Sequence, residues 1–176
     1  MQIIMIFSFK KHDTILYNTL LSLSRNLFFY NHVKLDDKFE IRINLMFFHF
    51  SIIMLIFKKK GVTFDQKSYD NLFYCIEYNL RELGFGDVSV NKKMKDLNKI
   101  LYDILLKIDL NEITYEKFKI NKNLVKGYFK PTDQRKQLKY EYIEKYFIDF
   151  YDFCFELTPD NMIEDLKNFK FSYGSS

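Results

Sequence analysis

The sequence has no alanine and no tryptophan, and it has only two cysteines, two prolines and five glycines in 176 residues. The two cysteines, Cys75 and Cys154, stand far apart in aromatic-rich segments. This rules out a disulfide-rich scaffold, so we expect both thiols to behave as small buried apolar groups in a reducing compartment. The sequence also lacks the alternating pattern of a β-strand and any low-complexity linker, which leaves helices as the expected structure.

Signatures of catalysis and of metal binding are scarce. The Gly-Phe-Gly at 84–86 has neither the spacing nor the strand context of a phosphate-binding loop. His12, His32 and His49 are isolated, none of them forms an HExxH motif, and neither cysteine has the partner spacing of a zinc site. His49 lies midway along the most apolar stretch, so we expect a hydrogen-bonded core histidine rather than a metal or haem ligand. We therefore expect no catalytic residue, no metal and no cofactor, and a small enzyme is the least favoured interpretation.

An acidic cluster at Asp36, Asp37 and Glu40 precedes that apolar stretch. Carboxylates at a helix N-terminus are favoured by the helix dipole, and this is the simpler interpretation. A metal site would need more oxygen ligands in an ordered loop.

The residues that are abundant are Lys, Asn, Ile, Phe and Tyr, with 19% aromatic, 48% hydrophobic and 28% charged residues. This composition is typical of AT-rich codon usage, so the identity of many core residues says little about function. The length suits one domain, which we expect to span 1–176 with a core at about 11–171 and peripheral ends at 1–10 and 172–176. The net charge of +4 permits contact with an anionic surface without requiring one.

Two apolar segments raise the question of a membrane. Residues 1–7 are apolar but short, with no basic region before them, which makes a poor signal peptide. Residues 43–57 contain Asn44 and Ser51 and are fewer than the roughly 20 apolar residues that a spanning helix needs. A buried core helix is therefore favoured. The lysines at 58–60 suit either a cytoplasmic membrane flank or the exposed last turn of such a helix.

Residues 69–108 predict a helix, a tight turn and a second helix that pack back to back. Gly84 directly follows the first apolar stripe, where a left-handed C-cap favours glycine, and Gly86 adds a second permissive point. The caps that we expect for the second helix are Asp87, Ser89 or Asn91. The apolar stripes, at spacings of three and four, are Tyr69, Phe73, Ile76, Leu80 and Leu83, and then Met94, Leu97, Leu101, Ile104 and Ile108.

The fold class that we predict is all-α: a single compact domain of six or seven helices around a central apolar helix (about 37–60) and a helical hairpin (about 65–108). Asp13 or Thr14 would cap the first helix, and Thr63 or Asp65 would cap the first arm of the hairpin. The remaining helices are expected at about 13–30, from 111 or 112 to 129, at 132–157, and from Pro159 onward.

Charged residues gather around the turn of the hairpin. Arg81 can pair with Glu77 four residues earlier, or it can reach Asp87 across the turn. These groups either tie the hairpin together or bind a partner directly. Lysines at 92, 93 and 95 would open the second helix against its dipole, as a solvated face or as a docking surface for an acidic partner, a lipid head group or RNA. No nucleic-acid recognition motif is present.

The stretch NLRELGFGDVSVNKKMK, residues 79–95, resembles the signature of the ubiquinol-cytochrome c chaperone family. That signature is an N-L-R-E-x-G-x-G-D run followed by a basic segment and a Met. The resemblance covers about 11–171, with its specificity concentrated between 70 and 95. The family's usual proline near the start of the second arm is Asn91 here, which can still cap a helix. Further similar elements are Leu16-Tyr17, the run at 37–40, the segment 123–128 and the closing segment 157–171.

The resemblance implies a non-enzymatic assembly factor for cytochrome b of the ubiquinol–cytochrome c reductase (bc1) complex, and the length fits the short alphaproteobacterial members. It implies cytochrome b or another bc1 subunit as partner, together with a small second assembly factor and the ribosome, and no small-molecule substrate. The expected location is cytoplasmic, with peripheral contact at the inner face of the cytoplasmic membrane. In eukaryotic relatives the location is the mitochondrial matrix and inner membrane.

The resemblance also implies a partner-binding surface in the signature itself. The alternative hypothesis is a basic helical module that binds the ribosome or RNA. If the lysines at 92–95 join those at 58–60 in one stripe, RNA binding is favoured, whereas lysines that flank an apolar groove favour the chaperone. The residues implied in partner binding are Asn79, Arg81, Glu82, Gly84, Gly86, Asp87, Lys92, Lys93 and Lys95.

Overall fold

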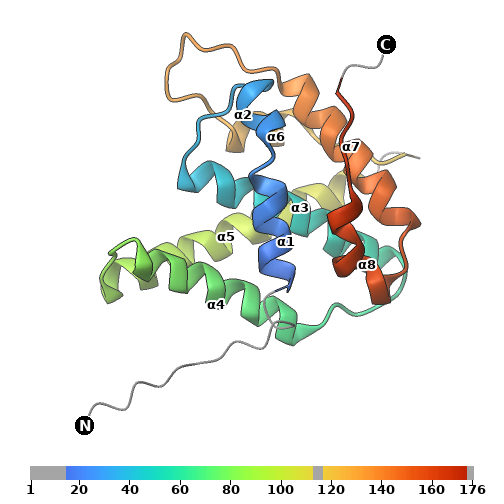
Figure 1. Ribbon diagram of the computed structural model, residues 1–176, viewed down its shortest axis with the longest axis horizontal. Helices are drawn as coiled ribbons and strands as arrows, with labels where there is room; N and C mark the ends of the chain where they lie inside the picture. Colours follow the sequence, from blue (N-terminus) through green and yellow to red (C-terminus); the bar gives the residue numbers. More distant parts are fainter. Residues whose placement is uncertain (1–14, 113–116, 174–176) are drawn as a thin grey trace.

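The computed structural model describes residues 15–112 and 117–173, and every regular element within those ranges is a helix. The all-α prediction is therefore confirmed (Figure 1). The apolar start at 1–7 and the expected caps Asp13 and Thr14 lie outside the described residues. The elements are α1 (Ile15–Ser24), α2 (Leu27–Asn31), α3 (Phe39–Lys59), α4 (Gln66–Glu82), α5 (Asp87–Glu112), α6 (Lys122–Tyr128), α7 (Tyr140–Glu156), α8 (Pro159–Asp165) and a 3-10 turn η1 (Leu166–Asn168).

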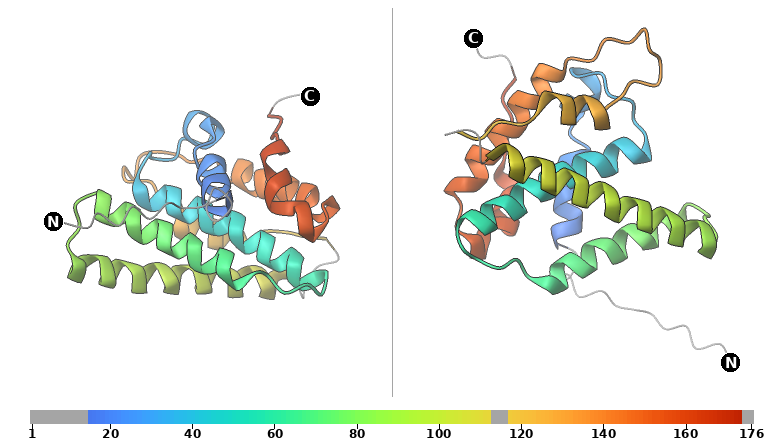
Figure 2. Two further views of the ribbon diagram at one scale, coloured as in Figure 1. Left: turned by 60° about the horizontal axis from the view of Figure 1, so that its bottom comes forward. Right: turned by 180° about the vertical axis from the view of Figure 1, so that it is seen from behind.

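Helix α3 is the centre of the molecule, as its apolar sequence predicts. It packs against α1, α5 and α7, which surround it on different sides (Figures 1 and 2). By length and composition α3 could cross a membrane, but 72% of its most apolar window is buried inside this structure. The interpretation as a core helix is therefore confirmed, and the α4–α5 hairpin forms one flank of the core.

The first predicted helix, at 13–30, is two helices joined by a turn, so the prediction of one continuous helix was wrong. The Asn26 side chain accepts a hydrogen bond from the Phe28 backbone N–H at 3.0 Å, which caps α2. The Ser24 hydroxyl donates to the Leu21 carbonyl at 2.7 Å, and the Tyr30 hydroxyl donates to the Ser24 carbonyl at 2.6 Å. The short polar side chains of Ser24 and Asn26 thus offer the backbone local partners that compete with a continuous helix.

The predicted helix from 111 or 112 to 129 is also shorter than expected. Helix α5 continues through Glu112, and the next described helix, α6, begins only at Lys122. The Asn121 side-chain Oδ1 accepts from the backbone N–H of Asn123 at 2.8 Å and of Leu124 at 3.3 Å. This N-cap sets the start of α6.

The predicted helix at 132–157 begins only at Tyr140, because the preceding segment is held by Asp36. The Asp36 carboxylate accepts hydrogen bonds from the Thr132 backbone N–H at 3.0 Å and from its hydroxyl at 2.7 Å. The Lys136 ammonium approaches the same carboxylate at 2.5 Å. These contacts, with the Lys136 hydrogen bond as the largest cause, lower the pKa of Asp36 far below its usual value. Asp36 therefore holds the loop that contains Thr132 and Lys136, and it does not cap a helix.

The side of α3 that faces α7 is a buried aromatic core around His49. The His49 Nδ1–H donates to the Leu45 carbonyl at 2.6 Å, and its Nε2 accepts from the Tyr146 hydroxyl at 2.9 Å. A carbonyl can only accept, which assigns this tautomer. Burial lowers the pKa of His49 to about 3, so the ring is neutral at physiological pH. The prediction of a hydrogen-bonded core histidine is confirmed, and Cys75 and Cys154 are buried, free thiols.

The lysines at the end of α3 serve this packing. Gly61 has φ +67° and terminates the helix. The Lys60 ammonium then donates to the Phe155 carbonyl at 2.6 Å and to the Leu157 carbonyl at 2.7 Å, at the C-terminus of α7. Lys59 donates to the Tyr151 hydroxyl at 3.0 Å. Two of the three lysines thus tie α3 to α7, which the helix dipole of α7 favours.

Candidate functional site

The turn of the α4–α5 hairpin has the geometry that its glycine predicts. Helix α4 begins at the N-cap Asp65, whose carboxylate accepts from the Ser68 N–H at 2.8 Å. At its other end Gly84 has φ +89°. The Gly84 N–H donates to the Arg81 carbonyl at 2.9 Å and the Phe85 N–H to the Leu80 carbonyl at 3.3 Å. This is a Schellman C-cap, which favours glycine only at its left-handed position, here Gly84.

Helix α5 begins earlier than a cap at Ser89 or Asn91 would allow. Its first residue is Asp87, and the Val90 N–H already donates to the Gly86 carbonyl at 2.9 Å. Asp87 places a carboxylate in the first turn, where the dipole favours it. The lysines that begin at Lys92 lie beyond that turn, so the expected cost against the dipole does not arise.

Arg81 makes both of the pairs that the sequence allows. Its Nη2 lies 2.8 Å from the Glu77 carboxylate, and its Nη1 contacts the Asp87 carboxylate across the turn. These two partners, with Asp87 the larger cause, raise the pKa of Arg81. The three side chains therefore link the end of α4 to the start of α5 at the surface.

The nine residues predicted for partner binding do not form one surface. Asn79 points inward, where its amide donates to the Tyr17 hydroxyl at 2.6 Å and to the Cys75 carbonyl at 2.9 Å. Glu82 lies on the outside beside Tyr78, and its charge raises the pKa of that phenol. The lysines lie on α5, separated from Asn79 by the whole turn.

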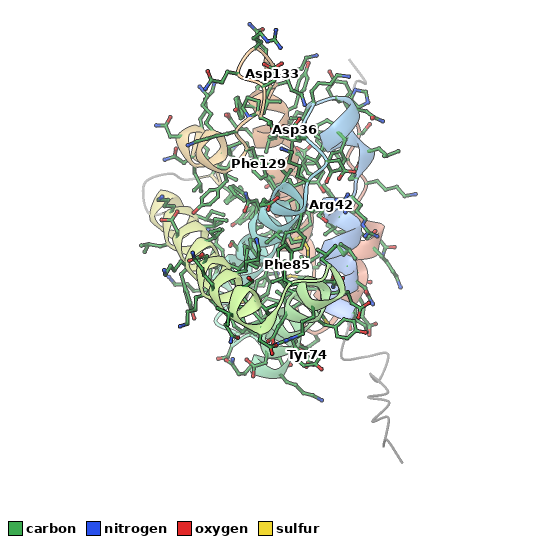
Figure 3. All side chains as sticks on the ribbon, turned by 90° about the vertical axis from the view of Figure 1, so that its left-hand side faces the viewer. Asp36, Arg42, Tyr74, Phe85, Phe129 and Asp133 are labelled. Carbon is green, nitrogen blue, oxygen red and sulfur yellow. The ribbon has the colours of Figure 1, made fainter. Side chains whose placement is uncertain are left out.

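The three lysines also differ from one another. The Lys93 ammonium lies 4.6 Å from the centre of the Phe85 ring, a cation–π contact that holds it against the turn. Lys92 and Lys95 are exposed to solvent. Figure 3 looks onto this end of the molecule, with Phe85 in the turn of the hairpin and Arg42 of α3 above it.

A groove between α1, α3 and α4 is the site that sequence reasoning missed. A cavity of about 210 Å³ lies between these helices, and a neighbouring hollow of about 400 Å³ shares Arg25 and Arg42 with it. Only Asn79 and Leu83 of its lining belong to the signature stretch, so no local pattern could have revealed it. The α1–α4 groove is lined by Tyr17, Leu21, Arg25, Leu27, Tyr30, Asp37, Phe39, Arg42, Ile43, Met46, Ile76, Asn79 and Leu83.

The α1–α4 groove combines an apolar floor with a cationic rim. Arg42 is paired with Asp37 at 2.6 Å, whereas Arg25 is exposed and makes no ion pair with any residue that the structure describes. Two leucines stand exposed at the edges, with 69% of Leu27 and 61% of Leu83 accessible. An exposed apolar surface with a surplus positive charge is suited to an apolar partner that carries a carboxylate.

A second, apolar cleft lies further along α3, between this helix and α5. It has a volume of about 340 Å³ and includes Lys58 at one end and Tyr102 and Leu106 of α5. Lys95 lies seven residues before Tyr102, about 10 Å along the helix. Lys99 stands between Lys95 and Tyr102 on the same face, and the apolar Tyr102 and Leu106 then separate the lysines of α5 from Lys58 at the cleft. This layout is the one that favours the chaperone hypothesis over RNA binding. The α3–α5 cleft is lined by Ser51, Met54, Leu55, Lys58, Tyr102, Leu105 and Leu106.

The fold and the site thus define an all-helical protein with an open groove of apolar and cationic residues. Among residues 15–112 and 117–173 no group of His, Cys, Asp or Glu could hold a metal ion. The model of the family described as ubiquinol-cytochrome C chaperone matches residues 31–149, which is more than half of the chain. The protein belongs to this family, and its role is that of an assembly chaperone for the ubiquinol–cytochrome c reductase complex. In comparisons with curated proteins and with solved structures, nothing matches.

Proposed function

We propose that the client of this chaperone is newly made cytochrome b, the membrane-embedded subunit of the complex. The observation that supports the proposal is the α1–α4 groove, which offers an apolar floor between two exposed leucines. A transmembrane segment that has not yet inserted exposes apolar side chains to water, and burying them in such a groove lowers the free energy. The chaperone would release the segment when the membrane or a partner subunit offers a drier environment.

Arg25 would fix the orientation of the bound segment. Its guanidinium stands at the junction of the two hollows without an ion pair among the described residues. A carboxylate of the client could pair with it bidentately, which adds geometric specificity to an apolar contact that has none. The small second assembly factor and the ribosome remain expectations of the family resemblance.

The function is tested by deleting the gene and measuring cytochrome b and ubiquinol–cytochrome c reductase activity. We expect both to fall and to recover when the wild-type gene is restored. Normal levels of both in the deletion strain would contradict the proposal.

The groove is tested with Leu27→Ser combined with Leu83→Ser. Both side chains are already exposed, so we expect an unchanged circular dichroism spectrum and thermal midpoint, but loss of cross-linking to nascent cytochrome b. Val62→Ser is the matched control, because Val62 is also exposed but lies after α3, outside the groove. Equal cross-linking by the double variant and the control would exclude the groove as the docking site.

A further inference from the structure

One straight line of exposed side chains runs along the outer face of α5. The residues recur at alternating spacings of four and three, which places them on one side of a helix. Apolar residues stand at the ends of the line and lysines in its middle. This α5 stripe consists of Val88, Lys92, Lys95, Lys99, Tyr102 and Leu106.

The apolar members of the α5 stripe are unusually exposed. The accessible fraction is 85% for Val88, 62% for Tyr102 and 58% for Leu106. Figure 2 (left) shows α5 along the lower edge of the molecule, on the far side of α3 from α1. Tyr102 and Leu106 stand one turn apart, and adjacent exposed apolar groups of this kind are typical of a surface that binds a partner or a membrane.

The charge of the α5 stripe is positive and almost uncompensated. Lys92 and Lys95 make no ion pair with any described residue, and Lys99 lies a loose 3.6 Å from Asp96. Two other acids of this helix are held elsewhere. Asp103 pairs with Lys107 at 2.7 Å and accepts from Tyr128, and Asp87 pairs with Arg81.

The residue types of the α5 stripe distinguish between two possible occupants, a partner helix and a membrane surface. A partner helix that packed along a three–four seam would need apolar residues throughout, and three successive lysines in the middle would oppose it. At an anionic membrane surface the same lysines extend to the head groups, while tyrosine and aliphatic side chains enter the interface. We infer that the α5 stripe is a membrane-docking surface that binds anionic phospholipid.

The α3–α5 cleft adds to this surface. Tyr102 and Leu106 belong both to the stripe and to the cleft, whose other walls include Met54 and Leu55 of α3. The apolar cleft therefore opens beside the membrane-facing end of the stripe, where a lipid acyl chain can enter. Ser51 also lines the cleft, with a buried hydroxyl that has no partner among the described atoms.

This inference goes beyond the proposed function, because the α5 stripe and the α1–α4 groove lie on opposite sides of α3. The protein can thus rest on the membrane with one side and keep the groove open on the other. A variant that loses vesicle binding at the α5 stripe should therefore keep client binding at the α1–α4 groove, and the reverse should also hold.

The test is co-sedimentation of the full chain with vesicles of pure phosphatidylcholine and with vesicles that contain phosphatidylglycerol. We expect binding to the anionic vesicles alone, and a decline with added salt. Lys92→Gln/Lys95→Gln/Lys99→Gln should weaken the partition coefficient by about two orders of magnitude. The matched control, Lys130→Gln/Lys167→Gln/Lys170→Gln, removes the same charge elsewhere and should retain binding.

A second variant, Tyr102→Ser/Leu106→Ser, keeps the charge and removes the apolar end of the stripe. We expect at least a severalfold loss of vesicle binding, with an unchanged circular dichroism spectrum. The inference is overturned if the wild type does not bind anionic vesicles at low salt. It is also overturned if the triple lysine variant of the stripe and the triple lysine control lose binding equally. Wild-type binding to RNA through the same lysines without binding to vesicles would overturn it as well.

Discussion

The two sides of α3 differ in how completely neighbouring helices cover them and in how many of their polar groups have protein partners. Towards α7 the helix buries His49 against Tyr146, and the ring nitrogens and the phenol have protein partners. Towards α1 and α4 the same helix contributes Arg42 to an open groove whose neighbouring Arg25 has no ion pair among the described residues. The closed side stabilises the fold, and the open side leaves apolar and charged groups for a partner. Breaking the closed side should therefore change stability, and altering the open side should change binding.

The largest effect should come from pH on the closed side. Burial holds the pKa of His49 at about 3 against an ordinary value of 6.5, so the unfolded chain binds this proton first. Stability is full above pH 6.5 and is lost as the pH falls towards 3. From pH 7 to pH 5 the free energy of unfolding should fall by about 2 kcal/mol, measured by urea denaturation.

His49→Leu with Tyr146→Phe removes the titrating ring and the phenol that depends on it. The double variant should lose most of this decline between pH 7 and pH 5. A decline as steep as in the wild type would assign the pH dependence to other groups.

The next largest effect should follow from loosening the contact between α3 and α7. Lys60→Ala removes two charge-assisted hydrogen bonds to the end of α7, which should lower the free energy of unfolding by about 1.5 kcal/mol. Lys95→Ala removes the same side chain from a solvent-exposed position and should leave stability unchanged. Equal stability of the two variants in urea denaturation would show that the lysines at the end of α3 are not structural.

A smaller effect is expected in the turn of the α4–α5 hairpin, where Gly84 and Gly86 differ in backbone conformation. Gly84→Ala forces a side chain into a left-handed conformation and should destabilise the protein by about 1 kcal/mol. Gly86→Ala should be neutral, because its φ is not left-handed and a Cβ there meets open space. Thermal melts of the two variants would contradict this assignment if their midpoints shifted together.

The smallest effect on folding should come from Arg81→Ala with Asp87→Ala. The pair is exposed to solvent, where ion pairs contribute little. We expect normal helical content and a small change in thermal midpoint, with weaker capture of the partner if the turn takes part in recognition. A loss of helical content would show that these side chains hold the hairpin together.

Prediction from the sequence was most accurate where local chemistry decides the structure. The central helix, the glycine cap at Gly84, the cap at Asp65 and the start of α8 at Pro159 depend on residues close together in the chain, and each is confirmed. The predictions were wrong where distant residues compete. Asp36 draws Thr132 into a loop, and the sequence contains no signal that these two residues meet.

The candidate site shows the same division. The pairing of Arg81 with Glu77 and with Asp87 follows from helical spacing and a short turn, so the sequence predicts it. The sequence also places the nine signature residues in one stretch, but it could not predict that Asn79 turns into a groove while Lys92 and Lys95 face solvent elsewhere. That separation depends on which helix covers which face.

By itself, the sequence determined the helical class, the buried centre and the family of this protein, because periodicity, caps and the signature are local properties. Only the tertiary structure decided the roles of its two groups of lysines. Lys60 lies within hydrogen-bonding distance of the α7 carbonyls, and Lys95 lies on an open face. A charge contributes to the fold or to a partner according to what packs against it, and residues distant in the chain supply that packing.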